Sequence, residues 1–168
     1  MKKIVLGGGC FWCIEAIFSD IKGVVSAKSG YCGGDENSAN YKDVCSGETL
    51  HVEVVEITYD EKILSLKNIL EIFFKIHDPT TLNRQGNDIG LQYSSIIFYN
   101  NEDEKSIIEE LIVGEQKNYS SKIVTKVELA HKFYIAEDYH QNYFKINPNQ
   151  GYCQAVIAPK VEKFKKSL

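Results

Sequence analysis

The chain has 168 residues, of which 43% are hydrophobic and 25% are charged, and its formal net charge is −4. This length suits one compact domain over residues 1–168. A negative charge balance without a long basic stripe argues against nucleic acid and anionic membrane as partners. No stretch is long and apolar enough to span a bilayer, and too few apolar residues follow Lys2 and Lys3 for a signal peptide, so we expect a cytoplasmic protein.

Hydrophobic spacing predicts alternating strands and helices. Short β-prone runs predict strands, and apolar residues at i, i+3, i+4 and i+7 predict amphipathic helices. In chain order we expect a strand at 3–6, a helix through 11–21, strands at 23–31 and 51–59, a helix through 66–74, a strand at 95–99, a helix through 102–112 and a strand at 123–129.

The predicted helix after residue 100 has a recognisable start. Asn101 is a suitable cap, and Glu104 stands three residues later as a capping-box partner. Its expected buried stripe is Ile107, Ile108, Leu111 and Ile112.

The order of these elements predicts an α+β fold. Its first six elements match the ferredoxin-like split βαβ arrangement, a mixed sheet with helices on one face. No linker divides the chain, and we expect a loop-rich C-terminal tail.

The first candidate for chemistry is a cysteine that follows a glycine run. Gly7–Gly9 separate the first strand from the first helix, and Cys10 stands where that helix begins. The positive end of a helix dipole stabilises a thiolate, which is the nucleophilic form of cysteine. Cys13 completes a Cys-x-x-Cys motif, which is typical of redox chemistry in cytosolic proteins.

Two other interpretations of these cysteines stay open. Cys10 and Cys13 can be small buried hydrophobic residues, and the neighbouring Trp12 can belong to the core or to an apolar substrate pocket. A structural zinc site is disfavoured, because Cys32 and Cys45 are far apart and the histidines lack ligand spacing.

The second candidate is a carboxyl group in the strongest predicted strand. Alternation places Glu53 on one face with Val55 and Ile57, and Glu56 on the other. A desolvated Glu53 would have a raised pKa and could donate a proton near neutral pH. If the strand lies at a sheet edge, both glutamates are solvated instead.

Several longer motifs resemble peptide methionine sulfoxide reductase A. The resemblance begins at Gly-Cys-Phe-Trp and spans nearly the whole chain. Its motifs lie at 9–12, 30–34, 41–47, 51–53, 77–88, 92–93, 136–141 and 147–153.

This resemblance implies a role for each site residue. Cys10 would attack the sulfoxide sulfur of the S epimer, and Glu53 would protonate the departing oxygen. Tyr41 and Tyr93 would hydrogen-bond that oxygen, Asp88 would order the polar side of the pocket, and Phe11 with Trp12 would hold the substrate methyl group.

The resemblance also implies how the enzyme is recycled. Cys10 would become a sulfenic acid and condense with a second cysteine, and thioredoxin or another dithiol would restore both thiols without a bound cofactor. Many relatives have glycine at the Cys13 position and use a C-terminal cysteine. We therefore expect Cys153, on a mobile tail, to be the cysteine that forms the disulfide with Cys10. Cys13 is the alternative or a second relay. We expect Cys32 and Cys45 to be structural.

The expected substrates are oxidised proteins, peptides and free methionine sulfoxide. The competing hypotheses are a general thioredoxin-like dithiol oxidoreductase that uses Cys10 and Cys13, and a metal-binding module without catalytic activity.

Overall fold

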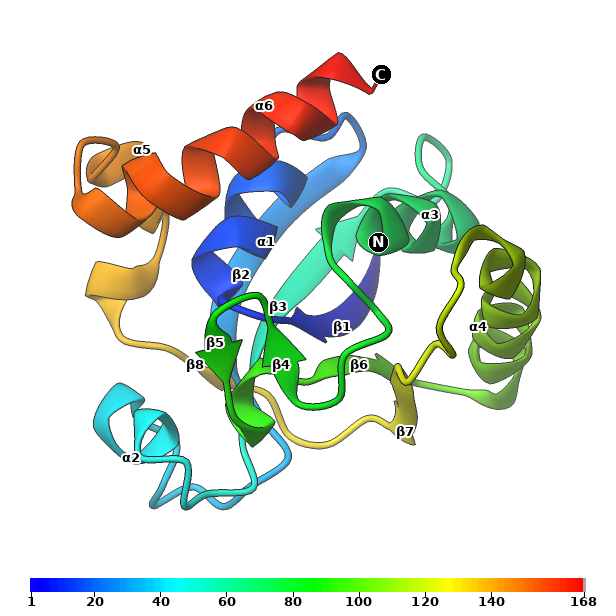
Figure 1. Cartoon of the computed structure of the whole chain (residues 1–168). Coiled ribbons are helices and arrows are strands. Elements are labelled where there is room, and N and C mark those ends of the chain that lie inside the picture. Colours follow the sequence, from blue (N-terminus) through cyan, green and yellow to red (C-terminus); the bar gives the residue numbers. More distant parts are fainter. Residues whose placement is uncertain (168) are drawn as a thin grey trace.

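A six-stranded sheet forms the centre of the molecule, and the computed structural model describes residues 1–167. The sheet order is β7-β6-β1-β3-β2-β8, and every neighbouring pair is antiparallel except the parallel pair β6 and β7. The strands are β1 (Lys2–Gly8), β2 (Val24–Cys32), β3 (Val52–Tyr59), β6 (Ser95–Tyr99), β7 (Lys126–Leu129) and β8 (Tyr134–Ile135). The predicted mixed sheet is confirmed (Figure 1).

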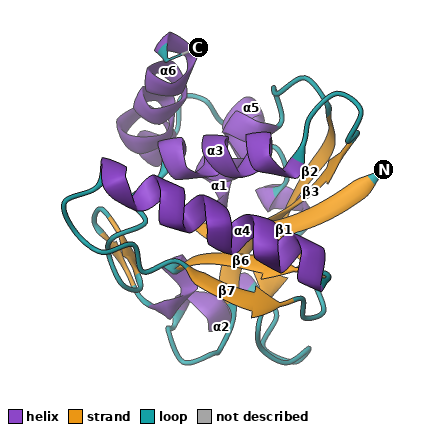
Figure 2. Ribbon diagram, turned by 90° about the vertical axis from the view of Figure 1, so that its right-hand side faces the viewer, coloured by secondary structure: helices purple, strands orange, loops and turns teal. Residues whose placement is uncertain are grey.

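The helices lie mainly on one side of this sheet (Figure 2). They are α1 (Phe11–Phe18), α2 (Tyr41–Cys45), α3 (Leu66–Ile76), α4 (Glu102–Glu115), α5 (Tyr143–Ile146) and α6 (Ala158–Lys166). Only α2 lies below the sheet in Figure 2. A small ribbon of β4 (Arg84–Gln85) and β5 (Asp88–Ile89) stands apart from the sheet. The α+β class is confirmed, whereas the ferredoxin-like comparison stays a prediction.

Both faces of the central strands are buried. Ile4 and Leu6 of β1 pack in the main core with residues of α1 and α3, such as Phe73. The opposite face buries a smaller cluster that includes Val54 of β3, and Phe133 packs against it. Since β3 lies between β1 and β2, it is not an edge strand. Its first four residues, Val52, Glu53, Val54 and Val55, are all buried, so the carboxyl group of Glu53 is removed from water, whereas Glu56 is half-buried.

The start of α4 differs in part from the prediction. Asn101 does cap the helix, because its side chain accepts a hydrogen bond from the Glu104 N–H at 2.9 Å. The Glu104 carboxylate, however, accepts from the Asn100 N–H, one residue before the cap, so the reciprocal half of the predicted box is missing. Ile107 is 40% exposed while Ile108 is fully buried, so the buried stripe is narrower than expected.

The C-terminal tail is more helical than the loop-rich tail that the sequence predicts. A π-helical turn at Cys153–Ile157 runs directly into α6, and Pro159 stands in the first turn of α6. Proline suits that turn because the first helical N–H groups have no partner within the helix. Cys153 is consequently held in a helical segment with no exposed surface. Within residues 1–167, no helix combines the length and apolarity needed to cross a bilayer.

Candidate active site

Cys10 occupies the sharp turn between β1 and α1. Gly9 before it has a φ of +94°, a backbone conformation that glycine adopts without strain. A Cβ atom at Gly9 would stand 2.8 Å from the side chain of Gln85, so the turn is closed as well as sharp. Cys10 itself has extended backbone angles, φ −61° and ψ 125°, and it is the N-cap residue of α1. The predicted position of Cys10 at a helix start is therefore observed.

The electrostatic surroundings of Cys10 differ from the prediction. Burial raises the pKa of its thiol well above the ordinary value, and the hydrogen bond to Cys13 and the negative charge of Glu53 raise it further. The hydrogen bond from the backbone of Trp12 opposes these effects but is smaller. Desolvation thus outweighs the helix N-terminus, and Cys10 rests as a thiol rather than a thiolate.

Cys13 lies one turn further along α1 and is hydrogen-bonded to Cys10. Its pKa is lowered, chiefly because its sulfur accepts the hydrogen bond from the Cys10 thiol; burial opposes this, and the charge of Lys160 adds to it. Cys13 and Cys153 also share a buried apolar cluster with residues of α6. The structure therefore brings the three thiols into one neighbourhood, with Cys13 hydrogen-bonded to Cys10 and packed with Cys153.

Glu53 is the buried carboxyl group of the site. Its side chain is 1% exposed, and its Oε1 accepts a hydrogen bond from the Phe11 N–H at 3.1 Å. Burial raises the pKa of Glu53 to about 8; the Phe11 hydrogen bond opposes this, and the charges of Asp88 and Cys13 add to it. The interpretation of a solvated edge-strand glutamate is wrong. Glu53 holds a proton at neutral pH beside the first turn of α1.

Three tyrosines and one aspartate are the other polar residues near Cys10 and Glu53. Tyr41 is the first residue of α2, and Tyr93 ends a 3₁₀ turn at Leu91–Tyr93. Burial, together with nearby carboxylates and thiols, raises the pKa of both hydroxyls, so both are hydrogen-bond donors at neutral pH. Tyr152 donates a hydrogen bond to Oδ2 of Asp88 at 2.7 Å. This contact ties the β4–β5 ribbon to the segment that carries Cys153.

An aromatic cluster surrounds Trp12. The ring of Tyr143 stacks on the indole at a centroid distance of 3.8 Å and an interplanar angle of 7°. Tyr152 meets the indole edge-on at 5.9 Å, and Phe11 lies 6.4 Å away. The indole Nε1–H donates to Nδ1 of His140 at 3.0 Å. Trp12 is half-buried, so it is neither a core residue nor a free surface residue.

Sequence reasoning missed several residues of this site. His140, Tyr143 and Tyr152 belong to a segment 128 to 140 positions away from Trp12. His140 and Tyr152 stand in two motifs of the resemblance, which was the one available signal, and Tyr143 lies between those motifs. Cys45 is exposed and hydrogen-bonds the hydroxyl of Tyr41. Cys32, by contrast, is fully buried under the sheet.

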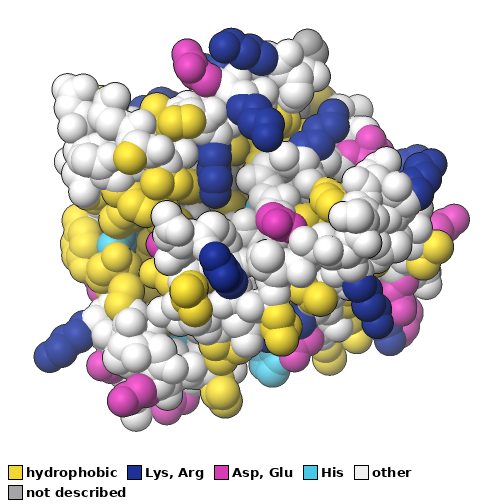
Figure 3. Space-filling view, viewed as in Figure 1, with side chains coloured by type: hydrophobic (Ala, Val, Ile, Leu, Met, Phe, Trp, Pro, Cys, Tyr) yellow, Lys and Arg dark blue, Asp and Glu magenta, His cyan; other side chains and the backbone are white. Residues whose placement is uncertain are grey.

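The surface around the site is apolar. Figure 3 shows hydrophobic side chains gathered on the side of the molecule between α5 and α2. Ile89, Tyr139 and Ile146 are each at least 60% exposed. Ile89 follows Asp88 in the sequence, Tyr139 precedes His140, and Ile146 ends α5, the short helix that begins at Tyr143. This surface suits a substrate with apolar groups.

Comparison with known proteins agrees with these features. The family model described as peptide methionine sulfoxide reductase matches residues 2–168. A peptide methionine sulfoxide reductase MsrA of Campylobacter jejuni is 58% identical over 163 residues, which cover 97% of this chain and 98% of that protein.

Solved structures are similar as well. Reduced Mxr1 of Saccharomyces cerevisiae is 36% identical with a TM-score of 0.86, and the match covers 90% of this chain and 88% of that one. Mxr1 in complex with Trx2 is 25% identical with a TM-score of 0.60, covering 84% of each chain. These similarities do not favour a general dithiol oxidoreductase. The chain belongs to the peptide methionine sulfoxide reductase family, and it is an oxidoreductase that acts on methionine sulfoxide.

Proposed function

We propose that the chain reduces the S epimer of methionine sulfoxide through a sulfenic acid on Cys10. The observation that supports this most strongly is Glu53, a carboxyl group that is 1% exposed and keeps its proton up to about pH 8. A sulfoxide oxygen leaves only when it is protonated, so the reaction needs a neutral acid close to the attacking sulfur. Glu53 lies one hydrogen bond from the residue that follows Cys10.

The first step conserves atoms and electrons. The Cys10 sulfur attacks the sulfoxide sulfur while the oxygen takes up a proton. The hydroxyl then passes to the Cys10 sulfur as the new S–S bond and the S–O bond of the substrate break, so methionine leaves and Cys10 becomes a sulfenic acid. Glu53 gives its proton to the oxygen and recovers one when the Cys10 thiol loses its own. The donor hydroxyls of Tyr41 and Tyr93 hold the oxygen, and the Asp88–Tyr152 pair orders the polar wall.

The aromatic residues provide the other half of the pocket. Phe11 and Trp12 hold the substrate methyl group against the rings that surround them. The handedness at sulfur is set by the arrangement of the methyl, the oxygen and the side-chain methylene, and an apolar wall opposite a polar one distinguishes the first two. This arrangement supports selection of one epimer.

We propose Cys13 as the first resolving thiol and Cys153 as the second. Cys13 already hydrogen-bonds Cys10, and Cys10 lies at the extended N-cap, where a bridge to the next turn is feasible. Cys153 is buried against Cys13 rather than free on a mobile tail. The Cys10 sulfenic acid would condense with the Cys13 thiol and release water, and the Cys153 thiol would then exchange into that disulfide.

Cys13→Ser and Cys153→Ser separate these two steps. After one turnover, we expect disulfide formation in Cys13→Ser to be about tenfold slower than in wild type, because the thiol next to Cys10 is removed. Disulfide formation is followed as the loss of free thiols. Cys153→Ser should form its first disulfide at the wild-type rate. Thiols counted after rapid acid quench measure both rates. A normal first phase in Cys13→Ser with a slow one in Cys153→Ser would assign resolution to Cys153 instead.

A thioredoxin is the proposed reductant. The Mxr1 relative was solved in complex with Trx2, and the thiols of this chain are free. Proposed substrates are oxidised proteins, peptides and free methionine sulfoxide. Because recycling requires a reducing compartment, we propose the cytoplasm as the place of action.

An assay with separated epimers tests the proposed function. The S sulfoxide of a short peptide should be reduced with thioredoxin, thioredoxin reductase and NADPH, while the R sulfoxide is left unchanged. An equimolar mixture should stop at half conversion. Equal reduction of both epimers, or turnover of protein disulfides without sulfoxide reduction, would contradict the proposal.

A further inference from the structure

His140 is a fully enclosed histidine whose contacts the reaction scheme leaves unexplained. It is 1% exposed, on the 3₁₀ turn Asp138–His140. Its ring lies among those of Tyr139, Tyr41, Phe11 and Trp12 at centroid distances of 4.2, 4.3, 5.1 and 5.5 Å. Histidine is costly to bury among aromatic rings unless its polar atoms are used.

One of its ring nitrogens has a contact that sets its protonation state. Nδ1 lies 3.0 Å from the indole Nε1 of Trp12. An indole N–H only donates, so Nδ1 must accept and cannot carry a proton. The ring proton is therefore on Nε2, which has no hydrogen-bond partner within residues 1–167. The contact with Trp12 is thus the single polar contact of this side chain in that part of the structure.

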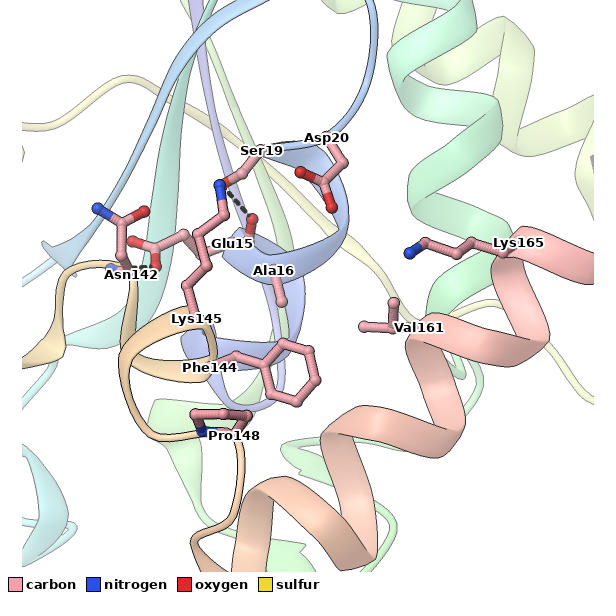
Figure 4. Close-up of a pocket in the computed structure, with 10 residues that line it drawn as sticks. All are labelled: Glu15, Ala16, Ser19, Asp20, Asn142, Phe144, Lys145, Pro148, Val161 and Lys165. Atoms are coloured by element: carbon pink, nitrogen blue, oxygen red, sulfur yellow. Dashed lines mark hydrogen bonds between the residues drawn. The ribbon is translucent and has the colours of Figure 1, made fainter.

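The segment that carries His140 is fastened to α1 at a second point. Oε1 of Glu15, on the turn of α1 after Trp12, accepts a hydrogen bond from the Asn142 N–H at 2.6 Å. Figure 4 shows Glu15 and Asn142 together at one side of a cavity of about 270 Å³ between α1, α5 and α6. The next residue, Tyr143, stacks on the indole. His140 holds the edge of the indole, and Tyr143 covers its face.

We infer that His140 is a positioning residue for Trp12: its neutral imidazole fixes the indole plane that forms one wall of the sulfoxide pocket. The pocket wall rests on the proposed function, whereas the contact between imidazole and indole does not. Protonation of Nδ1 would place an N–H against an N–H, so the indole is held only by the neutral ring.

The groups around His140 favour the neutral ring near pH 7. Burial lowers its pKa, and the charge of Glu137 opposes this. The ionisable groups that face it from α2 and from its own turn are Tyr41 and Tyr139, and burial raises the pKa of both, so neither carries charge. The rings that face it from α1 are those of Phe11 and Trp12, which carry no charge. The contact should therefore persist at neutral pH and fail in acid.

Fluorescence measures this directly, because Trp12 is the only tryptophan in the chain. In the substrate-free wild-type enzyme, emission should change as the pH falls from 7.5 to 5, with a midpoint below the ordinary histidine value of about 6.5. His140→Asn should lose this transition but keep the emission maximum of neutral wild type, since the amide oxygen of asparagine can accept from the indole. His131→Asn, at an exposed histidine, should titrate like wild type.

Kinetics separate positioning from a purely structural role. His140→Phe keeps a ring but has no acceptor, so KM for the peptide sulfoxide should rise about tenfold with kcat within about threefold. His140→Asn should recover most of this loss. A wild-type acid transition that survives in His140→Asn, or equal KM values in His140→Phe and wild type, would overturn the inference. Because the fluorescence needs no substrate, its failure is distinct from failure of the proposed reaction.

Discussion

Replacing Cys10 by serine is expected to lower sulfoxide reduction below about 0.1% of the wild-type rate, because it removes the thiol that is proposed to take the oxygen as a sulfenic acid. Cys10 is the N-cap residue of α1 and lies near Glu53, whereas Cys13 and Cys153 are buried in the apolar cluster with α6. Serine is smaller than cysteine and remains a suitable N-cap residue, so the fold should be retained. Steady-state turnover with dithiothreitol measures the loss without depending on thioredoxin.

Cys32→Ser is the matched control for this prediction. Cys32 is a fully buried cysteine on β2 whose sulfur contacts the His131 carbonyl oxygen, on the opposite side of the sheet from α1. Its substitution should alter thermal stability while leaving kcat within about twofold of wild type. Retained activity in Cys10→Ser, or an equal loss in Cys32→Ser, would show that the effect does not come from the chemistry of Cys10.

Replacing Glu53 by glutamine is expected to slow sulfenic acid formation by about 10²–10⁴-fold, the usual contribution of a general acid. Glutamine keeps an acceptor for the Phe11 N–H but has no proton to give. In the wild type, the rate of this step should fall as the pH rises through about 8, where Glu53 loses its proton. Single-turnover rates between pH 6 and 10 measure this, and the variant should lack the alkaline fall assigned to Glu53.

Although Glu53→Gln should lower the rate, it should not lower thermal stability at alkaline pH. The ordinary glutamate pKa is 4.5 and the folded value is about 8, so the folded state binds more protons between these limits. The stabilisation is fully present below pH 4.5 and is lost as the pH rises through about 8. At pH 9 Glu53→Gln should therefore melt at or above the wild-type Tm. A lower Tm with a normal rate would assign Glu53 to the core instead of to catalysis.

Local pattern was enough for most of the fold. The predicted strand at 95–99 coincides with β6, and the spacing of Leu66, Ile69, Leu70 and Phe73 located α3. The helical tail was harder to predict, because lysines dominate α6 and its apolar face depends on contacts with Cys13 and Ile17 of α1. Such contacts join residues about 150 positions apart, which spacing within one segment does not reveal.

In the candidate site too, local sequence motifs identified some residues, whereas other features depend on contacts between distant parts of the chain. The glycine turn located Cys10, and strand alternation identified Glu53 as a possible acid. The sign of the Cys10 pKa shift was wrong, because a helix N-terminus is visible in sequence but the burial that outweighs it is a property of the whole fold. His140 and Tyr143 contact Trp12 only because a segment distant in sequence packs on it.

The most direct test of Cys10 as the residue that becomes a sulfenic acid is a single turnover in a variant that cannot form the intramolecular disulfide. Cys13→Ser combined with Cys153→Ser removes both proposed resolving thiols and keeps Cys10. Mixed with excess S sulfoxide peptide and no reductant, it should produce one equivalent of methionine peptide. A dimedone adduct should then be found on Cys10 by mass spectrometry. Product without an adduct on Cys10, or an adduct on Cys45 instead, would contradict the central claim.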